Sequence, residues 1–293
     1  MRALFLLFAF AACRASGPEP ADSGRLQVAV SVPPQAYFVE KIGGDRVRVE
    51  VMIPPGYSHV DYPLTPRKMA ALTRAELYVK VGHPAFDYER KYVDPVLERS
   101  PGIRVVDMSR GMRLIDGGEG AEGHGHGLDH RGGDPHVWVA PETVAVAARN
   151  IAFALEEADP AHAAEYRANL RRFLGEIVAL DRRIRARLGG RGGKFMVYHP
   201  DWAYFARQYG LEQIAIEAEG KEPSAQRLIR LIDRARREDV KVVFVQGGFP
   251  RKSAQVIADA VGGRVVAANP QERDWAGNLL RVAEAFGEGF SNG

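Results

Sequence analysis

The sequence predicts an α/β protein of two lobes, in which mainly parallel sheets are flanked by helices and one long rigid helix joins the lobes. Three observations predict this fold. Short apolar runs alternate with segments of helical periodicity, the runs form two groups of four, and one unusually long helical segment separates the groups. Short strands separated by helices are typical of parallel sheets with βαβ crossovers.

The candidate strands are short runs rich in β-branched residues. They lie at 26–32, 46–53, 76–82 and 103–108 in the first half of the chain, and at 194–199, 213–218, 241–246 and 264–268 in the second half. A segment of helical spacing at 225–238 follows Ser224, a favourable N-cap, and lies between two of these runs. Each half of the chain therefore predicts one sheet with crossover helices.

The long helical segment runs from Ala161 to Leu188. Its apolar residues recur at steps of three and four, and Arg and Glu occupy the opposite face. The preceding Asp159-Pro160 is typical of a helix start, and the glycines at 189–193 of a helix end. At ~1.5 Å per residue this helix is about 42 Å long, more than a crossover in a small sheet needs. We interpret it as a link between two lobes, and the alternative is a long surface helix within a single domain.

These patterns divide the chain of 293 residues into four parts. We expect a signal peptide with a lipoprotein tether at 1–25, an N-terminal α/β lobe at 26–158, a linker helix at 159–190 and a C-terminal α/β lobe at 191–293. Hydrophobic residues make up 46% and charged residues 26% of the chain, which is typical of a globular protein. The formal net charge is only +3 and the chain has no basic run, so we expect no nucleic-acid partner.

The first residues have the pattern of an export signal. Arg2 precedes an apolar run at 3–12, which is too short to span the ~30 Å of a bilayer core. Cys13 is the only cysteine, and the preceding Phe-Ala-Ala resembles a bacterial lipobox, so we expect lipidation of Cys13. The alternative is a peptide removed by ordinary cleavage. A single cysteine excludes an intramolecular disulfide and a zinc–thiolate site. We expect an exported protein, lipid-anchored to the membrane on the periplasmic or extracellular side.

Three of the eight histidines share a local setting. His59 follows the candidate strand that ends near Ile53, His199 ends another candidate strand, and His136 lies in the segment DPHVWVAPE. The carboxyl ends of parallel strands are where open α/β sheets bind ligands. Two of these histidines belong to the first lobe and one to the second. A metal bound by all three would therefore lie in the cleft between the lobes.

Five segments carry a resemblance to a known family. They read PPGYSHVDYPLTP, DPHVWVAPETVAVAARNIAFAL, VYHPDWAYFARQYGL, EGKEPSAQRLIRLI and DWAGNLLRVAEAF. In this order they resemble the cluster A-I solute-binding proteins that serve ABC transporters for zinc and manganese, from about Leu26 to Phe286. The resemblance implies two lobes joined by a long helix, a metal cargo, a membrane permease as partner and no enzymatic activity. It also implies that His59, His136 and His199 bind the metal.

The fourth ligand is where the sequence departs from that family. The family commonly has a carboxylate just after the last strand of the second lobe, and here Asn269 stands in its place. An Asn carbonyl oxygen is a weaker ligand than a carboxylate for a hard cation, and water is an equally good candidate. Further alternatives are Asp274 and the acidic residues Glu217, Glu219 and Glu222. Asn269 is our candidate, and the position stays open at this point.

The ligand set also bears on the metal. Three imidazoles with a neutral fourth ligand favour Zn(II), whereas Mn(II) favours more carboxylates and a higher coordination number. We therefore expect a monomer that captures Zn(II) as transported ligand for an ABC permease. The alternatives are the same fold binding Mn(II), copper, nickel or another divalent metal, and a surface adhesin. A zinc hydrolase is a further alternative, although no HExxH motif is present.

A glycine-rich segment at 117–133 precedes His136. Eight of its residues are glycine, and it contains His124, His126 and His130. Such a segment buries too little apolar surface to offset the entropy of fixing it, so it is predicted to be a loop. It resembles the His- and acid-rich loop of zinc-type family members. We expect auxiliary metal binding, weaker than in a preformed cleft because ordering the loop opposes it. The alternative is a solvated linker.

Overall fold

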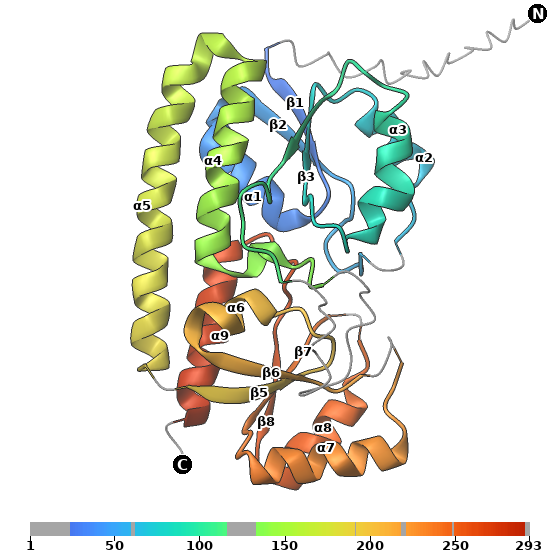
Figure 1. The fold of residues 1–293 in the computed structure, drawn as a ribbon, viewed down its shortest axis with the longest axis vertical. Helices are drawn as coiled ribbons and strands as arrows, with labels where there is room; N and C mark the ends of the chain where they lie inside the picture. Colours follow the sequence, from blue (N-terminus) through green and yellow to red (C-terminus); the bar gives the residue numbers. More distant parts are fainter. Residues whose placement is uncertain are drawn as a thin grey trace, which may run out of the picture.

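The computed structural model describes residues 24–59, 62–115, 133–190, 192–217, 221–247 and 249–290. Within these residues the chain folds into two parallel four-stranded sheets with helices on both faces (Figure 1). The predicted α/β fold with two lobes is confirmed. The signal peptide, Cys13, and the segment with His124, His126 and His130 lie outside the described residues.

All eight predicted strands are present in the described chain. The first sheet contains β1 (Leu26–Val30), β2 (Val47–Val51), β3 (Leu77–Lys80) and β4 (Arg104–Asp107), and the second contains β5 (Gly193–Val197), β6 (Leu211–Ala215), β7 (Val242–Val245) and β8 (Arg264–Ala267). The strand orders are β2-β1-β3-β4 and β6-β5-β7-β8, so the lobes repeat one topology. In each lobe the strand order reverses beside the first strand. Ligands of open parallel sheets bind outside the carboxyl ends of the strands at such a point.

Helices cover both faces of each sheet. The longer ones are α1 (Pro33–Gly43), α4 (Pro141–Ala158), α5 (Ala163–Leu188), α7 (Ala225–Arg237), α8 (Lys252–Val261) and α9 (Trp275–Phe290). The shorter ones are α2 (Pro66–Leu72), α3 (Asp94–Leu97) and α6 (Ala203–Tyr209), together with short turns at Gly44–Arg46, Glu89–Val93, Val137–Val139 and Pro160–His162. None of the described helices is long and apolar enough to cross a membrane.

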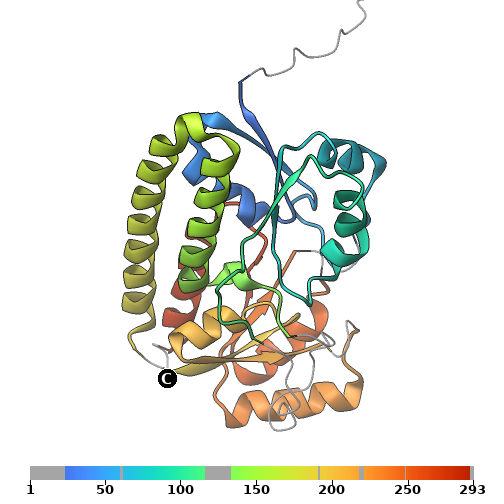
Figure 2. The same cartoon turned by 45° about the horizontal axis from the view of Figure 1, so that its top comes forward.

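Helix α5 lies along both lobes (Figures 1 and 2). It begins at Ala163, two residues later than predicted, because Pro160–His162 forms a separate turn. Asp159, just before this turn, accepts a hydrogen bond from the Tyr166 hydroxyl of α5. Its apolar face packs against α1 and α4 of the first lobe and α9 of the second. One hydrophobic cluster consequently runs through both lobes.

Aromatic rings tie the lobes together beside α5. Trp275 of α9 lies edge-on to Phe38 of α1, with ring centroids 5.3 Å apart, and to Phe173 of α5 at 6.4 Å. All three side chains are almost fully buried. Aromatic pairs of this geometry add to the free energy of burial. The lobes are therefore joined by a packed core as well as by the chain, and this limits how far they separate.

Candidate metal centre

His136 is fixed by the residue two positions before it. Asp134 and His136 are both fully buried. One carboxylate oxygen of Asp134 accepts the backbone N–H of His136 at 2.8 Å and lies 2.6 Å from its Nδ1. A carboxylate beside Nδ1 favours the tautomer with a proton on Nδ1, and this leaves the lone pair of Nε2 for a metal. The sequence DPH thus contains both the ligand candidate and its support.

His199 has the same kind of support from a neighbouring strand. It follows β5, and its Nδ1 lies 2.6 Å from Oε1 of Glu217, which follows β6. Arg227 of α7 donates to the carbonyl oxygens of Ile216 and Glu217 at 3.2 and 2.9 Å and so fixes the end of β6. Phe249 stacks on the imidazole of His199 at 5.7 Å. The ring is held from both its edge and its face.

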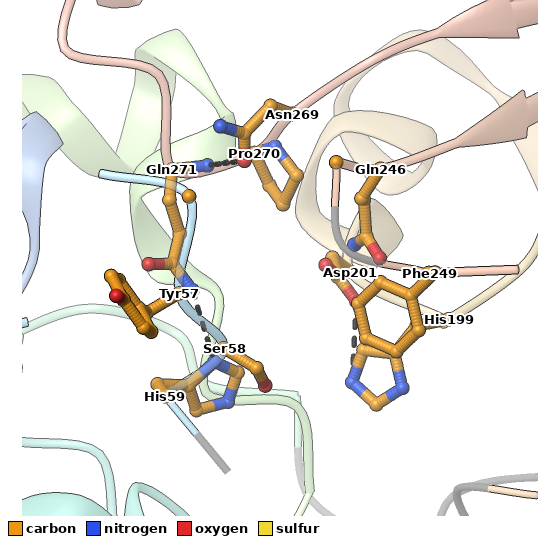
Figure 3. Close-up of a pocket in the computed structure, with 12 residues that line it drawn as sticks. Tyr57, Ser58, His59, His199, Asp201, Gln246, Phe249, Asn269, Pro270 and Gln271 are labelled. Atoms are coloured by element: carbon orange, nitrogen blue, oxygen red, sulfur yellow. Dashed lines mark hydrogen bonds and ion pairs between the residues drawn. The ribbon is translucent and has the colours of Figure 1, made fainter. Parts of the chain in front are cut away.

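His59 is held differently. Its imidazole stacks on Phe86 of the first lobe at 5.2 Å, and its Nδ1 lies 3.3 Å from Nε2 of Gln271. Gln271 follows β8 and belongs to the second lobe, so this contact crosses the cleft (Figure 3). Phe86 is positioned by a turn after β3 that passes through Gly82 with φ of 77°, where a Cβ would lie 1.7 Å from the Asp107 carboxylate. Only glycine fits that turn.

The three imidazoles surround one small space at the lobe boundary. Ring centroids are 4.9 Å apart for His59 and His136, 6.0 Å for His136 and His199, and 6.5 Å for His59 and His199. Zn–N bonds of about 2.0–2.1 Å in a tetrahedral site place ring centres roughly 5 Å apart. The two longer separations both involve His199, the histidine of the second lobe. The structure thus brings together the three histidines that the sequence singled out.

Asp201 also belongs to this cluster, and sequence reasoning missed it. Its Oδ1 lies 3.3 Å from Nε2 of His199 and 4.0 Å from Nε2 of His136. Ligand atoms of these three residues lie within 4.8 Å of one another, and all three residues are buried. A signal was present in the sequence, because His-Pro-Asp directly follows a predicted strand.

Burial and neighbouring charges shift the proton equilibria of the site. Burial raises the pKa of Asp201 to about 8, and the nearby carboxylates of Asp134 and Glu217 act in the same direction against the opposing effect of His199. Burial by itself lowers the pKa of His199, but the carboxylates of Asp201 and Glu217 outweigh it and raise this pKa to about 9. The metal-free site therefore retains protons at neutral pH, and a divalent cation must displace them to bind.

The candidates for a fourth ligand that the sequence offered have other hydrogen-bond or ion-pair partners, or lie outside the described residues. Asn269 lines the same pocket, but its Oδ1 accepts the backbone N–H of Gln271 at 3.0 Å, and in Figure 3 its side chain lies across the pocket from the rings of His59 and His199. Glu222 accepts the Ser253 hydroxyl at 2.5 Å, and Asp274 pairs with Arg281 at 3.2 Å. Glu217 stands behind His199, and Glu219 lies outside the described residues.

Comparisons with known proteins agree on one family. The family model described as zinc-uptake complex component A, periplasmic, matches residues 28–286. The chain is 30% identical to the high-affinity zinc uptake system protein ZnuA of Bacillus subtilis over 92% of this chain and 86% of that protein. It is 26% identical to the zinc-binding lipoprotein AdcA of Streptococcus pneumoniae over 92% of this chain, and spans 53% of that longer protein. A crystal structure of ZnuA superposes with a TM-score of 0.81 at 37% identity, covering 90% of this chain and 98% of the other.

Proposed function

This chain belongs to the family of periplasmic zinc-uptake component A proteins, and we propose that it captures Zn(II) through His59, His136 and His199. It is the exported solute-binding component of an ABC importer, it works with a membrane permease, and it is not an enzyme. Zinc is its cargo.

The convergence of three imidazoles from two lobes carries this proposal. Their ring centroids lie 4.9 to 6.5 Å apart, and a carboxylate beside Nδ1 of His136 and of His199 leaves Nε2 of each of these two rings for a cation. Neutral imidazole nitrogens are ligands that Zn(II) prefers, whereas Mn(II) favours oxygen ligands and a higher coordination number. Zinc is accordingly the favoured cargo over manganese.

Release to the permease requires only a small movement. His59 and His136 belong to the first lobe and His199 to the second, while the aromatic contacts of Trp275 restrict lobe separation. Coordination bonds are about 2 Å long, so a displacement of roughly 1 Å between the lobes breaks the bond to His199. Docking on the permease opens the site by such a displacement. Protein docked on the permease should differ by about this amount from free zinc-bound protein in the separation of the lobes, and identical separations would contradict the mechanism.

The protein acts as a monomer tethered through Cys13. The apolar run before Cys13 supports the tether, as does the description of the pneumococcal relative as a lipoprotein. We expect the mature chain to carry a lipid on Cys13, and Cys13→Ala to move it from the membrane to the soluble fraction. Mass spectrometry of the mature N-terminus checks this, and an unmodified N-terminus beyond Cys13 would contradict it.

The proposed site is tested by competition with a chromophoric chelator of known zinc affinity. Metal-free protein should bind one zinc tightly, and His59→Ala, His136→Ala and His199→Ala should each lower the affinity by more than about 100-fold, because each removes a direct ligand. His162→Ala is the matched control, since His162 pairs with Asp159 in the turn before α5. Wild-type affinity in the three site variants would place the cargo elsewhere.

A further inference from the structure

Three buried carboxylates surround the three histidines, and they fall into two kinds. Asp134 and Glu217 each place an oxygen 2.6 Å from the Nδ1 of a histidine, on the side of the ring away from the cation. Asp201 instead faces Nε2 of His199 at 3.3 Å and Nε2 of His136 at 4.0 Å. The first two carboxylates orient imidazoles, whereas Asp201 occupies the side on which a cation would bind.

We propose that Asp201 is the fourth ligand of the cation, an inference that rests on the proposed function because it shares His136 and His199 with that site. In a tetrahedral site with bonds of about 2.0–2.2 Å, neighbouring ligand atoms lie roughly 3.3–3.5 Å apart. The distance from Asp201 Oδ1 to His199 Nε2 is 3.3 Å, and the distance to His136 Nε2 is 4.0 Å. A contraction of about half an ångström brings the second distance to the coordinated value.

The burial of Asp201 supports the same conclusion. Its side chain is 5% exposed, and Oδ1 accepts no hydrogen bond from the residues that the structure describes; its ion pairs are with Nε2 of His199 and of His136, the two atoms that would bind the cation. A buried carboxylate is costly unless it is paired, hydrogen-bonded or bound to a metal. Oδ1 points toward the two Nε2 atoms, so a divalent cation placed between them satisfies it. The local backbone favours this direction, because Asp201 N–H donates to the His199 carbonyl oxygen at 3.0 Å and closes a tight turn.

Asn269 is the rival for this role, and its surroundings argue against it. Its Oδ1 accepts the backbone N–H of Gln271 at 3.0 Å, and its backbone carbonyl oxygen accepts the side-chain amide of Asn278 at 2.8 Å. Figure 3 shows its side chain across the pocket from the rings of His59 and His199. The carboxylate that the second lobe lacks after its last strand is supplied instead two residues after His199.

This assignment changes the character of the site. Each lobe then supplies two ligands, His59 and His136 from the first, and His199 and Asp201 from the second. The second pair lies on one turn and moves as a unit when the lobes separate. The negative charge of Asp201 strengthens the binding of a divalent cation relative to a neutral fourth ligand. Separation of the lobes therefore removes an anionic ligand and an imidazole together.

The test compares Asp201→Ala, Asp201→Asn and Asn269→Ala in the full mature chain. We expect Asp201→Ala to lower zinc affinity by more than about 100-fold, a larger loss than the about 10–100-fold typical of residues that only support a ligand. Asp201→Asn keeps the shape and loses the charge, so it should fall between Asp201→Ala and the wild type. Asn269→Ala should lose less than about tenfold. Asp181→Asn is the matched control, because this carboxylate of α5 accepts hydrogen bonds from Arg185, Gln208 and Tyr209.

Cobalt(II) bound in place of zinc supplies a second readout. Its visible absorption reports the ligand set, and the spectrum should change in Asp201→Ala but not in Asn269→Ala or Asp181→Asn. A wild-type spectrum and affinity in both Asp201 variants, or a larger loss in Asn269→Ala than in Asp201→Ala, would overturn the assignment. The proposed function is judged separately by His136→Ala. Loss of zinc in His136→Ala with retention in the Asp201 variants would reject Asp201 alone, whereas tight binding in His136→Ala would reject the site itself.

Discussion

The three histidines of the site are supported in two different ways. The Nδ1 atoms of His136 and His199 lie 2.6 Å from carboxylate oxygens of their own lobes, whereas Nδ1 of His59 lies 3.3 Å from the amide of Gln271 in the other lobe. Charge-assisted hydrogen bonds are shorter and stronger than neutral ones. The first two rings therefore keep their orientation at any lobe separation, while the support of His59 depends on the lobes being together.

The two kinds of Nδ1 partner have different consequences for zinc binding and for zinc release. Rings that are oriented before the cation arrives contribute binding free energy without an ordering cost. A ring whose partner lies across the cleft loses that partner as soon as the lobes part. We infer that His136 and His199 are oriented for capture before the lobes close, and that the contact between His59 and Gln271 couples capture to closure.

The largest expected effect is the pH dependence of zinc affinity, which His199 and Asp201 determine. His199 and Asp201, whose pKa values are raised to about 9 and about 8, hold protons that zinc must displace. Zinc displaces one proton from each group, so its affinity should fall by about 100-fold per pH unit below pH 8, or about 10⁴-fold between roughly pH 8 and pH 6. Chelator competition across this range measures it, and a flat profile would contradict the protonated state of the pair.

The stability of the metal-free protein should fall as the pH rises, whereas its zinc affinity increases, and the same groups cause both changes. A group whose pKa is raised on folding stabilises the fold fully below its unfolded value and loses that contribution as the pH rises through the folded value. For His199 this window extends from about pH 6.5 to about pH 9. The melting temperature of zinc-free protein should thus decline across the window more in the wild type than in His199→Ala.

The next effect concerns the orienting carboxylate of His199. Glu217→Gln removes the charge beside Nδ1 but keeps the size of the side chain, so His199 stays in place as a weaker ligand. We expect zinc affinity to drop by about 10–100-fold, as is typical of outer partners of metal-bound histidines. Glu212→Gln is the matched control on β6, the strand that Glu217 follows, since Glu212 pairs with Lys194 and Arg234 near the surface. An unchanged affinity in Glu217→Gln would show that orientation by the carboxylate adds nothing.

A smaller effect, on the rate of zinc dissociation, is expected from a change of Gln271, the partner of His59. Gln271→Leu removes the contact across the cleft and leaves the stacking of Phe86 on His59 intact. We expect zinc dissociation to accelerate by up to about tenfold, because the lobes part more readily when this contact is absent. Stopped-flow capture of released zinc by excess chelator measures the rate, with Gln255→Leu on the surface of α8 as control. A loss as large as that of Glu217→Gln would erase the distinction between the two kinds of support.

The sequence predicted the fold better than the site, for physical reasons. Strands such as β7 are continuous apolar runs, and the face of α5 repeats at helical spacing, so local pattern specifies both. The position of His199 after a strand also follows from the chain alone. Asp201 escaped because its role depends on how one turn aims a side chain at His136, which is 65 positions away in the sequence. Contacts of this kind arise from tertiary packing and leave no local pattern.

The contact of Gln271 with His59 was even less predictable from the sequence. Nothing in the sequence surroundings of Gln271 connects it with His59, which is 212 positions away, and the two residues meet because helices of both lobes pack against α5. The Asn269 candidate came from the family pattern after the last strand, and the structure places that residue in the pocket with its side chain turned to Gln271. Its exclusion as a ligand stays a prediction until the variants are measured.

The smallest expected effect is that of deleting residues 117–132, which include His124, His126 and His130. The residues on either side are fixed by the fold: Ile115 and Asp134 form an antiparallel bridge, and Asp134 N–H donates to the Ile115 carbonyl oxygen at 3.0 Å. Bridged residues lie about 5 Å apart, so two or three residues close the gap without moving Asp134 from His136. One tight zinc site should remain, with an affinity within about twofold of the wild type, because the partner of His136 is retained. If the segment collects zinc for the site, loading from dilute zinc should be slower in the deletion. Equal loading rates would reject that role, and loss of the tight site would show that these histidines belong to it.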